Sequence, residues 1–162
     1  KLIIEALRNT DKRFKNNQSV TPGFLIAALL WPEIIEKSLK KGEINLRKFF
    51  RCMDQILRKQ QKITAVPRKF HSYIKDIWIL QLKLHSRIGK QPYKTLKHPR
   101  FRAAYDFLLL REKAANSKKN IGKWWTDFQT SDDSIKKILI NNLREKNIEE
   151  SSKTFGFSAE LR

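Results

Sequence analysis

Apolar residues recur every three or four positions through most of this chain, and only five glycines and five prolines interrupt them. This spacing lines up apolar side chains along one face of a helix, whereas a half-buried strand requires strict alternation. The segments Phe49–Leu57 and Phe101–Leu109 show the pattern most clearly. The sequence therefore predicts an all-α fold, a compact bundle of about seven or eight short to medium helices.

Proline and capping residues indicate where helices begin and end. Thr21 is placed to cap a helix that has Pro22 at its first position. We expect Pro32 to break or kink that helix, and a second short helix to end at Gly42. Asp132 is placed to cap the last helix, through a carboxylate that accepts a backbone N–H.

The organisation expected along the 162 residues is a helical region followed by an extra helix and a tail. The expected boundaries are 1–130 for the helical region, 131–146 for the additional helix and 147–162 for a flexible tail without periodicity. The chain starts at Lys1 rather than at a methionine, and its first residues resemble a helix cut part-way. We therefore expect a fragment of a longer protein.

Composition predicts a cytoplasmic protein. Cys52 is the only cysteine, which excludes an internal disulfide framework and a thiolate zinc cluster and favours a reducing compartment. The longest apolar run, from Pro22 to Pro32, is about half of the roughly 20 residues that a membrane helix needs. No membrane partner is expected.

The net charge is +19, from 35 basic and 16 acidic side chains, and it is unevenly distributed. Residues 1–60 carry +7, residues 61–130 carry +12 and residues 131–162 carry none. No carboxylate lies between Asp76 and Asp106. A solvated helix face normally mixes both signs, so this window predicts a surface for a polyanion such as RNA. The candidate RNA-binding residues in and beside it are Arg68, Lys69, Lys75, Lys83, Arg87, Lys90, Tyr93, Lys94, Lys97, Arg100 and Arg102.

The aromatic residues allow two interpretations. Tyr93 lies among lysines and near prolines, so it is a candidate for stacking on a base as well as for packing. Trp124 and Trp125 repeat the helical spacing of Ile121 and Phe128, so at least one of them is expected in the core.

Catalytic motifs are missing from the sequence. It has no glycine-rich phosphate loop, no Asp-x-Asp pair and no nucleophile elbow. The three histidines are far apart, and Cys52 lies on an apolar stripe, which indicates a buried, inert thiol. We expect no catalytic residue, no metal site and no bound cofactor in this chain.

Several strings of residues, in one order, resemble the C-terminal region of bacterial poly(A) polymerases. They are Arg8–Asp11, Thr21–Leu25, Val66–Phe70, Asp76–Trp78, Leu80–Leu82, Arg87–Lys90, His98–Leu108, Trp124–Trp125 and Phe128–Gln129. The run His98–Leu108 is the most specific of them. The resemblance implies a parent enzyme whose N-terminal nucleotidyltransferase head, absent from this chain, uses ATP and Mg²⁺ to add AMP to RNA 3′ ends in mRNA processing and decay.

This resemblance implies RNA, and RNA-degradation proteins such as an RNA helicase, as partners. It also implies that the chain is inactive alone. Members of the family often end in an arginine-rich tail, whereas residues 131–162 carry no net charge, so we expect RNA contact at residues 68–102. The alternative function is a basic protein-interaction module that docks an acidic partner. Salt-dependent binding to an unstructured oligonucleotide distinguishes the two.

Overall fold

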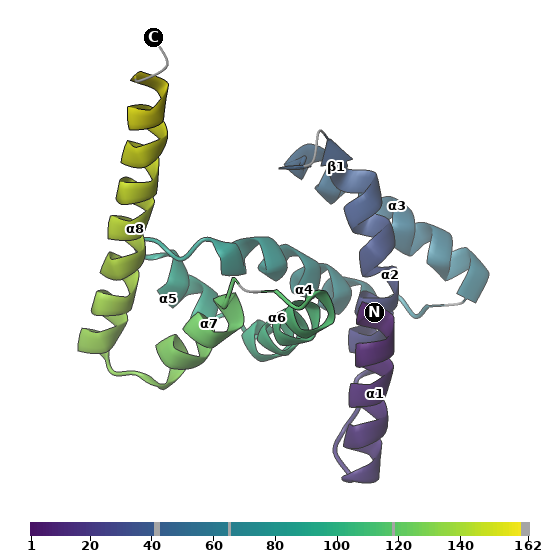
Figure 1. Ribbon diagram of the computed structural model, residues 1–162. Helices are drawn as coiled ribbons and strands as arrows, with labels where there is room; N and C mark the ends of the chain where they lie inside the picture. The colour runs from purple at the N-terminus through teal and green to yellow at the C-terminus, as the bar shows by residue number, and fades with distance from the viewer. Residues whose placement is uncertain (41–42, 65, 118, 160–162) are drawn as a thin grey trace.

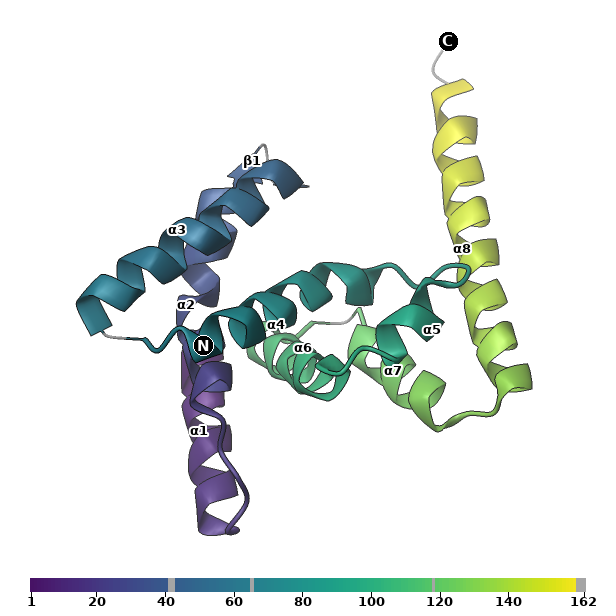
Figure 2. The ribbon, with the colours of Figure 1, turned by 180° about the vertical axis from the view of Figure 1, so that it is seen from behind.

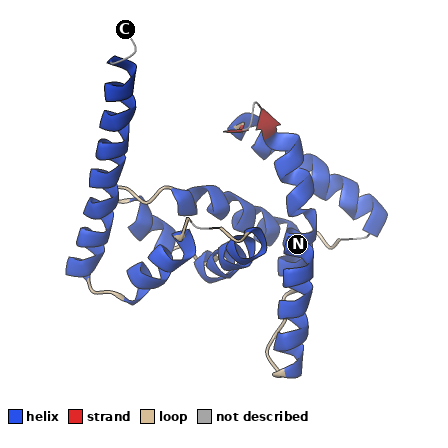
Figure 3. Ribbon diagram, in the orientation of Figure 1, coloured by secondary structure: helices blue, strands red, loops and turns tan. Residues whose placement is uncertain are grey.

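The computed structural model describes residues 1–40, 43–64, 66–117 and 119–159, without the side chains of Lys40, Glu43 and residues 147–159. Eight helices make up most of this part of the chain (Figure 1). They are α1 (Leu2–Lys15), α2 (Pro22–Ser38), α3 (Leu46–Thr64), α4 (Lys69–His85), α5 (Gln91–Leu96), α6 (Phe101–Ala115), α7 (Ile121–Thr130) and α8 (Asp133–Ala159). Two-residue strands β1 (Leu39–Lys40) and β2 (Glu43–Ile44) pair antiparallel between α2 and α3 (Figure 3). The all-α prediction is confirmed.

Helix α2 corrects one expectation from the sequence. Pro32 lies inside the helix, which continues to Ser38 and is followed by β1. Of the two alternatives predicted at Pro32, a break is therefore wrong, and so is the second helix; Gly42 lies outside the described residues. Proline removes only one backbone hydrogen bond, and buried residues on both sides of it, including Trp31 and Ile34, hold the helix against its neighbours. Tertiary packing therefore outweighs the local preference.

The helix starts follow the capping signals in part. Pro22 occupies the first turn of α2, and Thr21 is extended but makes no side-chain cap. The carboxylate of Asp132 accepts a hydrogen bond from the N–H of Ile135 at 2.9 Å, as expected for a cap.

A first apolar core lies among α1, α2, α3, the start of α4 and Phe107 of α6. Helix α3 lies across α2, as Figure 2 shows from behind. Trp78 is completely buried there, and its indole N–H donates to the carbonyl of Ala27 at 3.1 Å. Such a bond satisfies the one polar atom of a large apolar side chain, so it fixes α4 against α2.

A second core joins the end of α4 to α6, α7 and the start of α8. Trp124 and Trp125 are both buried, so the sequence prediction for this pair is confirmed. The indole N–H of Trp125 donates to the carbonyl of Leu84 at 2.9 Å. Gln81, buried between the cores, donates to the carbonyls of Ile77 and Ala104, and this links α4 to α6.

Helix α8 contacts the rest of the molecule through its first turns and then extends away from the other helices (Figures 1 and 2). It covers the helix expected at 131–146 and continues as helix through most of 147–162, where a flexible tail was expected. No helix in the described part of the chain is long and apolar enough to span a bilayer.

Candidate nucleic-acid interface

A groove of about 710 Å³ lies between α5 and α8, and we call it the lysine groove. Its described lining residues include four lysines and no carboxylate. They are Gly89, Lys90, Tyr93, Lys94, Lys97, Lys137, Ile140 and Asn141. None of the four lysines forms an ion pair with a described residue. Among the described side chains, the groove therefore presents unpaired positive charge beside the apolar Ile140, which suits an anionic chain.

Helices α5 and α8 position these lysines. Lys94 lies on α5, Lys90 is the residue just before it and Lys97 the residue just after it. One short helix and its two ends therefore carry three positive charges. Lys137 comes from α8, whose Ile140 is buried against the second core. Sequence reasoning missed Lys137 because the charges of residues 131–162 sum to zero, and a sum does not show which side chains share a face.

Tyr93 lines this groove and is half-buried. Its ring packs edge-on against Phe128 of α7, with 5.4 Å between ring centres. The packing interpretation of Tyr93 is therefore confirmed, while stacking on a base stays a prediction for a residue that also lines the groove.

Arg100 and Arg102 lie elsewhere, in a second hollow of about 310 Å³ that we call the arginine pocket. It is bounded by α1, the loop after α1, the start of α2, α4 and the start of α6. Its lining residues are Asn9, Thr10, Arg13, Ser19, Val20, Thr21, Phe24, Tyr73, Pro99, Arg100, Arg102, Ala103 and Asp106. No residue lines both this pocket and the lysine groove.

Lys75 and Arg87 line neither hollow and make contacts within the protein. Lys75 pairs with Asp54 of α3 at 2.5 Å, which links α3 to α4, and this contact lowers the pKa of the Asp54 carboxyl. The guanidinium of Arg87 lies 5.4 Å from the ring centre of Trp124. Burial lowers the pKa of Arg87, and its Nε is buried without a hydrogen-bond partner among the described residues.

The other candidates, Arg68, Lys69 and Lys83, are exposed on α4 or just before it and line neither hollow. Lys69 lies over the ring of Phe70, 5.2 Å from its centre. The eleven candidate residues therefore do not form one track. Four of them share the lysine groove and two share the arginine pocket.

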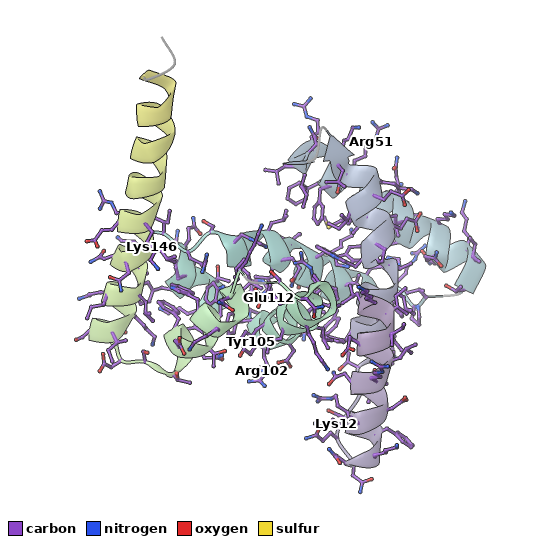
Figure 4. The ribbon with its side chains drawn as sticks, viewed as in Figure 1. Lys12, Arg51, Arg102, Tyr105, Glu112 and Lys146 are labelled. Atoms are coloured by element: carbon purple, nitrogen blue, oxygen red, sulfur yellow. The ribbon has the colours of Figure 1, made fainter. Side chains whose placement is uncertain are left out.

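Helix α3 carries basic residues that sequence reasoning did not select. Its six basic side chains are exposed and accompany a single acidic residue, Asp54. They are Arg47, Lys48, Arg51, Arg58, Lys59 and Lys62. Figure 4 labels Arg51 on this helix, away from Lys146 on α8 and Lys12 on α1. A count of charged residues over Leu46–Thr64 alone would have identified these six basic side chains.

Arg111 and Glu112 of α6 stabilise the centre of the fold. The Arg111 guanidinium donates to the side-chain carbonyl of Gln81 at 3.0 Å and lies 4.5 Å from the ring centre of Trp31. Burial lowers its pKa to about 10, against the opposing effect of Glu112, so it stays charged at neutral pH. Both residues line a third, mostly apolar hollow of about 680 Å³.

The structure thus defines a basic all-α module whose surface carries two separate cationic hollows. A family model described as "Polymerase A arginine-rich C-terminus" matches residues 41–154, and the chain belongs to this family. This confirms the resemblance found in the sequence strings.

Individual relatives agree with the family match. Poly(A) polymerase I of Escherichia coli O6:H1 is 36% identical over 152 residues, which are 90% of this chain and 33% of that protein. The Salmonella typhi protein of the same name is 34% identical over 149 residues, 88% of this chain and 32% of the relative. That of Haemophilus influenzae is 33% identical over 145 residues, 86% of this chain and 32% of the relative. The chain spans about a third of the length of these curated relatives.

The described residues contain no group of three or more His, Cys, Asp or Glu side chains arranged to hold a metal ion. The Mg²⁺ that the resemblance implies therefore has no fitting donor set in this part of the chain, and no step through Mg²⁺ is assigned to it.

Proposed function

We propose that this chain is the RNA-holding region of a bacterial poly(A) polymerase, which adds AMP from ATP to RNA 3′ ends in the cytoplasm. The observation that carries the proposal is the lysine groove, where four lysines gather without a carboxylate among the described lining residues. The family supports this assignment, because its relatives are named poly(A) polymerase I. ATP and Mg²⁺ belong, in this proposal, to the nucleotidyltransferase part of the enzyme.

The chemistry of the groove suits single-stranded RNA of any sequence. Lysine ammonium groups are flexible point charges that pair with phosphates and release condensed counterions, which gives affinity without base recognition. Tyr93 adds one aromatic edge to the lining. An enzyme that extends many different transcripts needs this kind of sequence-independent contact.

The test measures how binding of a labelled oligoadenylate depends on salt concentration. The groove variant changes Lys90, Lys94, Lys97 and Lys137 to Gln. For single strands, the slope of log affinity against log salt is about −0.7 per phosphate neutralised, so losing four contacts reduces the slope by about 2.8. Between roughly 50 and 200 mM salt, the wild type should therefore lose about 50-fold more affinity than the variant.

A control variant carries the same change in charge on other helices. It replaces four exposed lysines, namely Lys12 and Lys15 of α1 and Lys48 and Lys62 of α3, so both variants have a net charge of +15 instead of +19. The proposal expects the groove variant to lose most of the salt dependence and the control to keep it. Equal slopes for the two variants would refute the assignment to the lysine groove. Binding of an acidic protein such as an RNA helicase, without binding of RNA, would support the protein-interaction function instead.

A further inference from the structure

The arginine pocket gathers three stretches that are distant in the sequence. Asn9 and Thr10 come from α1, Thr21 and Phe24 from the start of α2, and the stretch 99–106 from the start of α6. The same stretches belong to the strings that carry the family resemblance. Three of the segments that carry the family resemblance therefore contribute residues to the lining of this pocket.

The charges in this pocket do not balance. It is lined by three arginines and one carboxylate, and that carboxylate, Asp106, pairs with Arg102 at 3.2 Å. Arg13 and Arg100 form no ion pair with any described residue, and the Nε–H of Arg13 donates to the carbonyl of Ser19 at 3.0 Å. Two guanidinium groups beside one cavity repel each other unless an anion is present, and their forked donors suit a phosphate.

Aromatic rings form the other part of the lining. The guanidinium of Arg100 lies over Tyr73, 5.0 Å from the ring centre, so a cation–π contact draws it toward this wall of the pocket. Tyr73 is half-buried, and burial raises the pKa of its hydroxyl, although the neighbouring Thr21 hydroxyl and the charges of Arg100 and Arg13 oppose this. Phe24 supplies a second ring. Guanidinium planes and aromatic rings are surfaces on which nucleobases stack.

The size of the pocket limits the ligand. Its volume of about 310 Å³ is near the lower end of the about 300–1,000 Å³ typical of small-molecule sites. We propose that the arginine pocket binds a single nucleotide unit, with Arg13 and Arg100 on the phosphate and the base against the Arg100–Tyr73 pair. This site goes beyond the proposed RNA contact of the lysine groove, which reads only a phosphate backbone.

The experiment titrates the 162-residue chain with AMP, adenosine and inorganic phosphate, and follows binding by calorimetry and by backbone amide NMR. AMP is expected to bind more tightly than either of the other two probes and to shift the backbone amides of residues 100–106. Arg100→Gln should weaken AMP binding about tenfold or more, as expected for a lost charge-assisted contact. Arg144→Gln on α8, which removes the same charge far along the chain, should leave binding unchanged.

Arg13→Gln provides a second pocket variant. It keeps the test decisive if circular dichroism shows that Arg100→Gln does not fold.

A competition experiment identifies the source of the nucleotide. If a 5′-phosphorylated oligoadenylate displaces AMP, the unit belongs to an RNA end, whereas AMP binding without displacement indicates a free nucleotide. Either result supports the pocket.

Three results would overturn this proposal. They are no detectable binding of AMP at roughly 10 mM, equal binding of AMP and inorganic phosphate, and equal loss of binding in the Arg100→Gln and Arg144→Gln variants. The Lys90/Lys94/Lys97/Lys137 variant separates this proposal from the previous one. It should lose oligoadenylate affinity but keep AMP binding, so that either site can fail without the other.

Discussion

Glu112 of α6 takes the place of a missing cap on α7, and its removal should be the most damaging change of a polar residue in this region. One carboxylate oxygen accepts the N–H of Ile121 at 2.9 Å, and the other accepts the N–H of Gly122 at 3.0 Å. Asn120, which precedes the helix, makes no side-chain cap. The first N–H groups of a helix have no partner within it, so α7 depends on this contact from a neighbouring helix.

The magnitude follows from these two bonds. A hydrogen bond to a charged group contributes about 1.5–3 kcal/mol, so the loss of both in Glu112→Ala should lower the free energy of unfolding by about 3–6 kcal/mol. Glu112→Gln keeps one acceptor oxygen and should lose about half as much. Urea unfolding at neutral pH, followed by circular dichroism and by tryptophan fluorescence, measures both values.

The control is Glu33→Ala on α2. Glu33 contacts Lys37 at 2.6 Å and Lys59 of α3 at 4.0 Å, in solvent-accessible pairs that contribute at most about 1 kcal/mol each. If Glu112→Ala cost no more than Glu33→Ala, the carboxylate would not be holding the start of α7 and the reasoning would be refuted.

Two further predictions concern contacts between helices. Gly23→Ala places a Cβ 2.8 Å from Cδ1 of Tyr73 and 3.2 Å from Cδ1 of Phe70, so these rings or the two helices must shift, and thermal unfolding should show a loss of about 1–3 kcal/mol. Lys113 pairs with Glu5 at 2.7 Å and lowers the pKa of that carboxyl below 4.5. The stability from this pair is therefore complete above pH 4.5 and is lost as the pH falls through the lowered pKa, so acid should reduce the urea midpoint less in Glu5→Gln than in the wild type.

The helices were predictable because their signals are local. The apolar spacing of Phe101–Leu109 and the cap at Asp132 both depend on residues within two turns of each other. Pro32 was misinterpreted because its context is tertiary, since buried residues of α2 are held by α3 and α4. Glu112 gave no sequence signal for the same reason. Its partners lie nine and ten residues further along the chain, on another helix.

The candidate site was predicted in part. The carboxylate-free window does contain Lys90, Lys94 and Lys97, which share a groove in the structure. Sequence separation gave no indication that Lys137 joins them from α8, or that Asp54 reaches Lys75 from α3. Which charges are paired depends on helix packing, and a count along the chain includes paired and unpaired side chains alike.

The two cationic hollows follow one another along the backbone, and this bears on how one ligand strand would meet them. Lys97 lines the groove and Arg100 lines the pocket, so three peptide units separate them and their Cα atoms lie within about 11 Å. The segment between them is held by hydrogen bonds from His98 N–H to Thr95 and from Phe101 N–H to His98. These hydrogen bonds fix the spacing between Lys97 and Arg100. If both proposals hold, a strand that follows this turn would reach the lysine groove and the arginine pocket in succession.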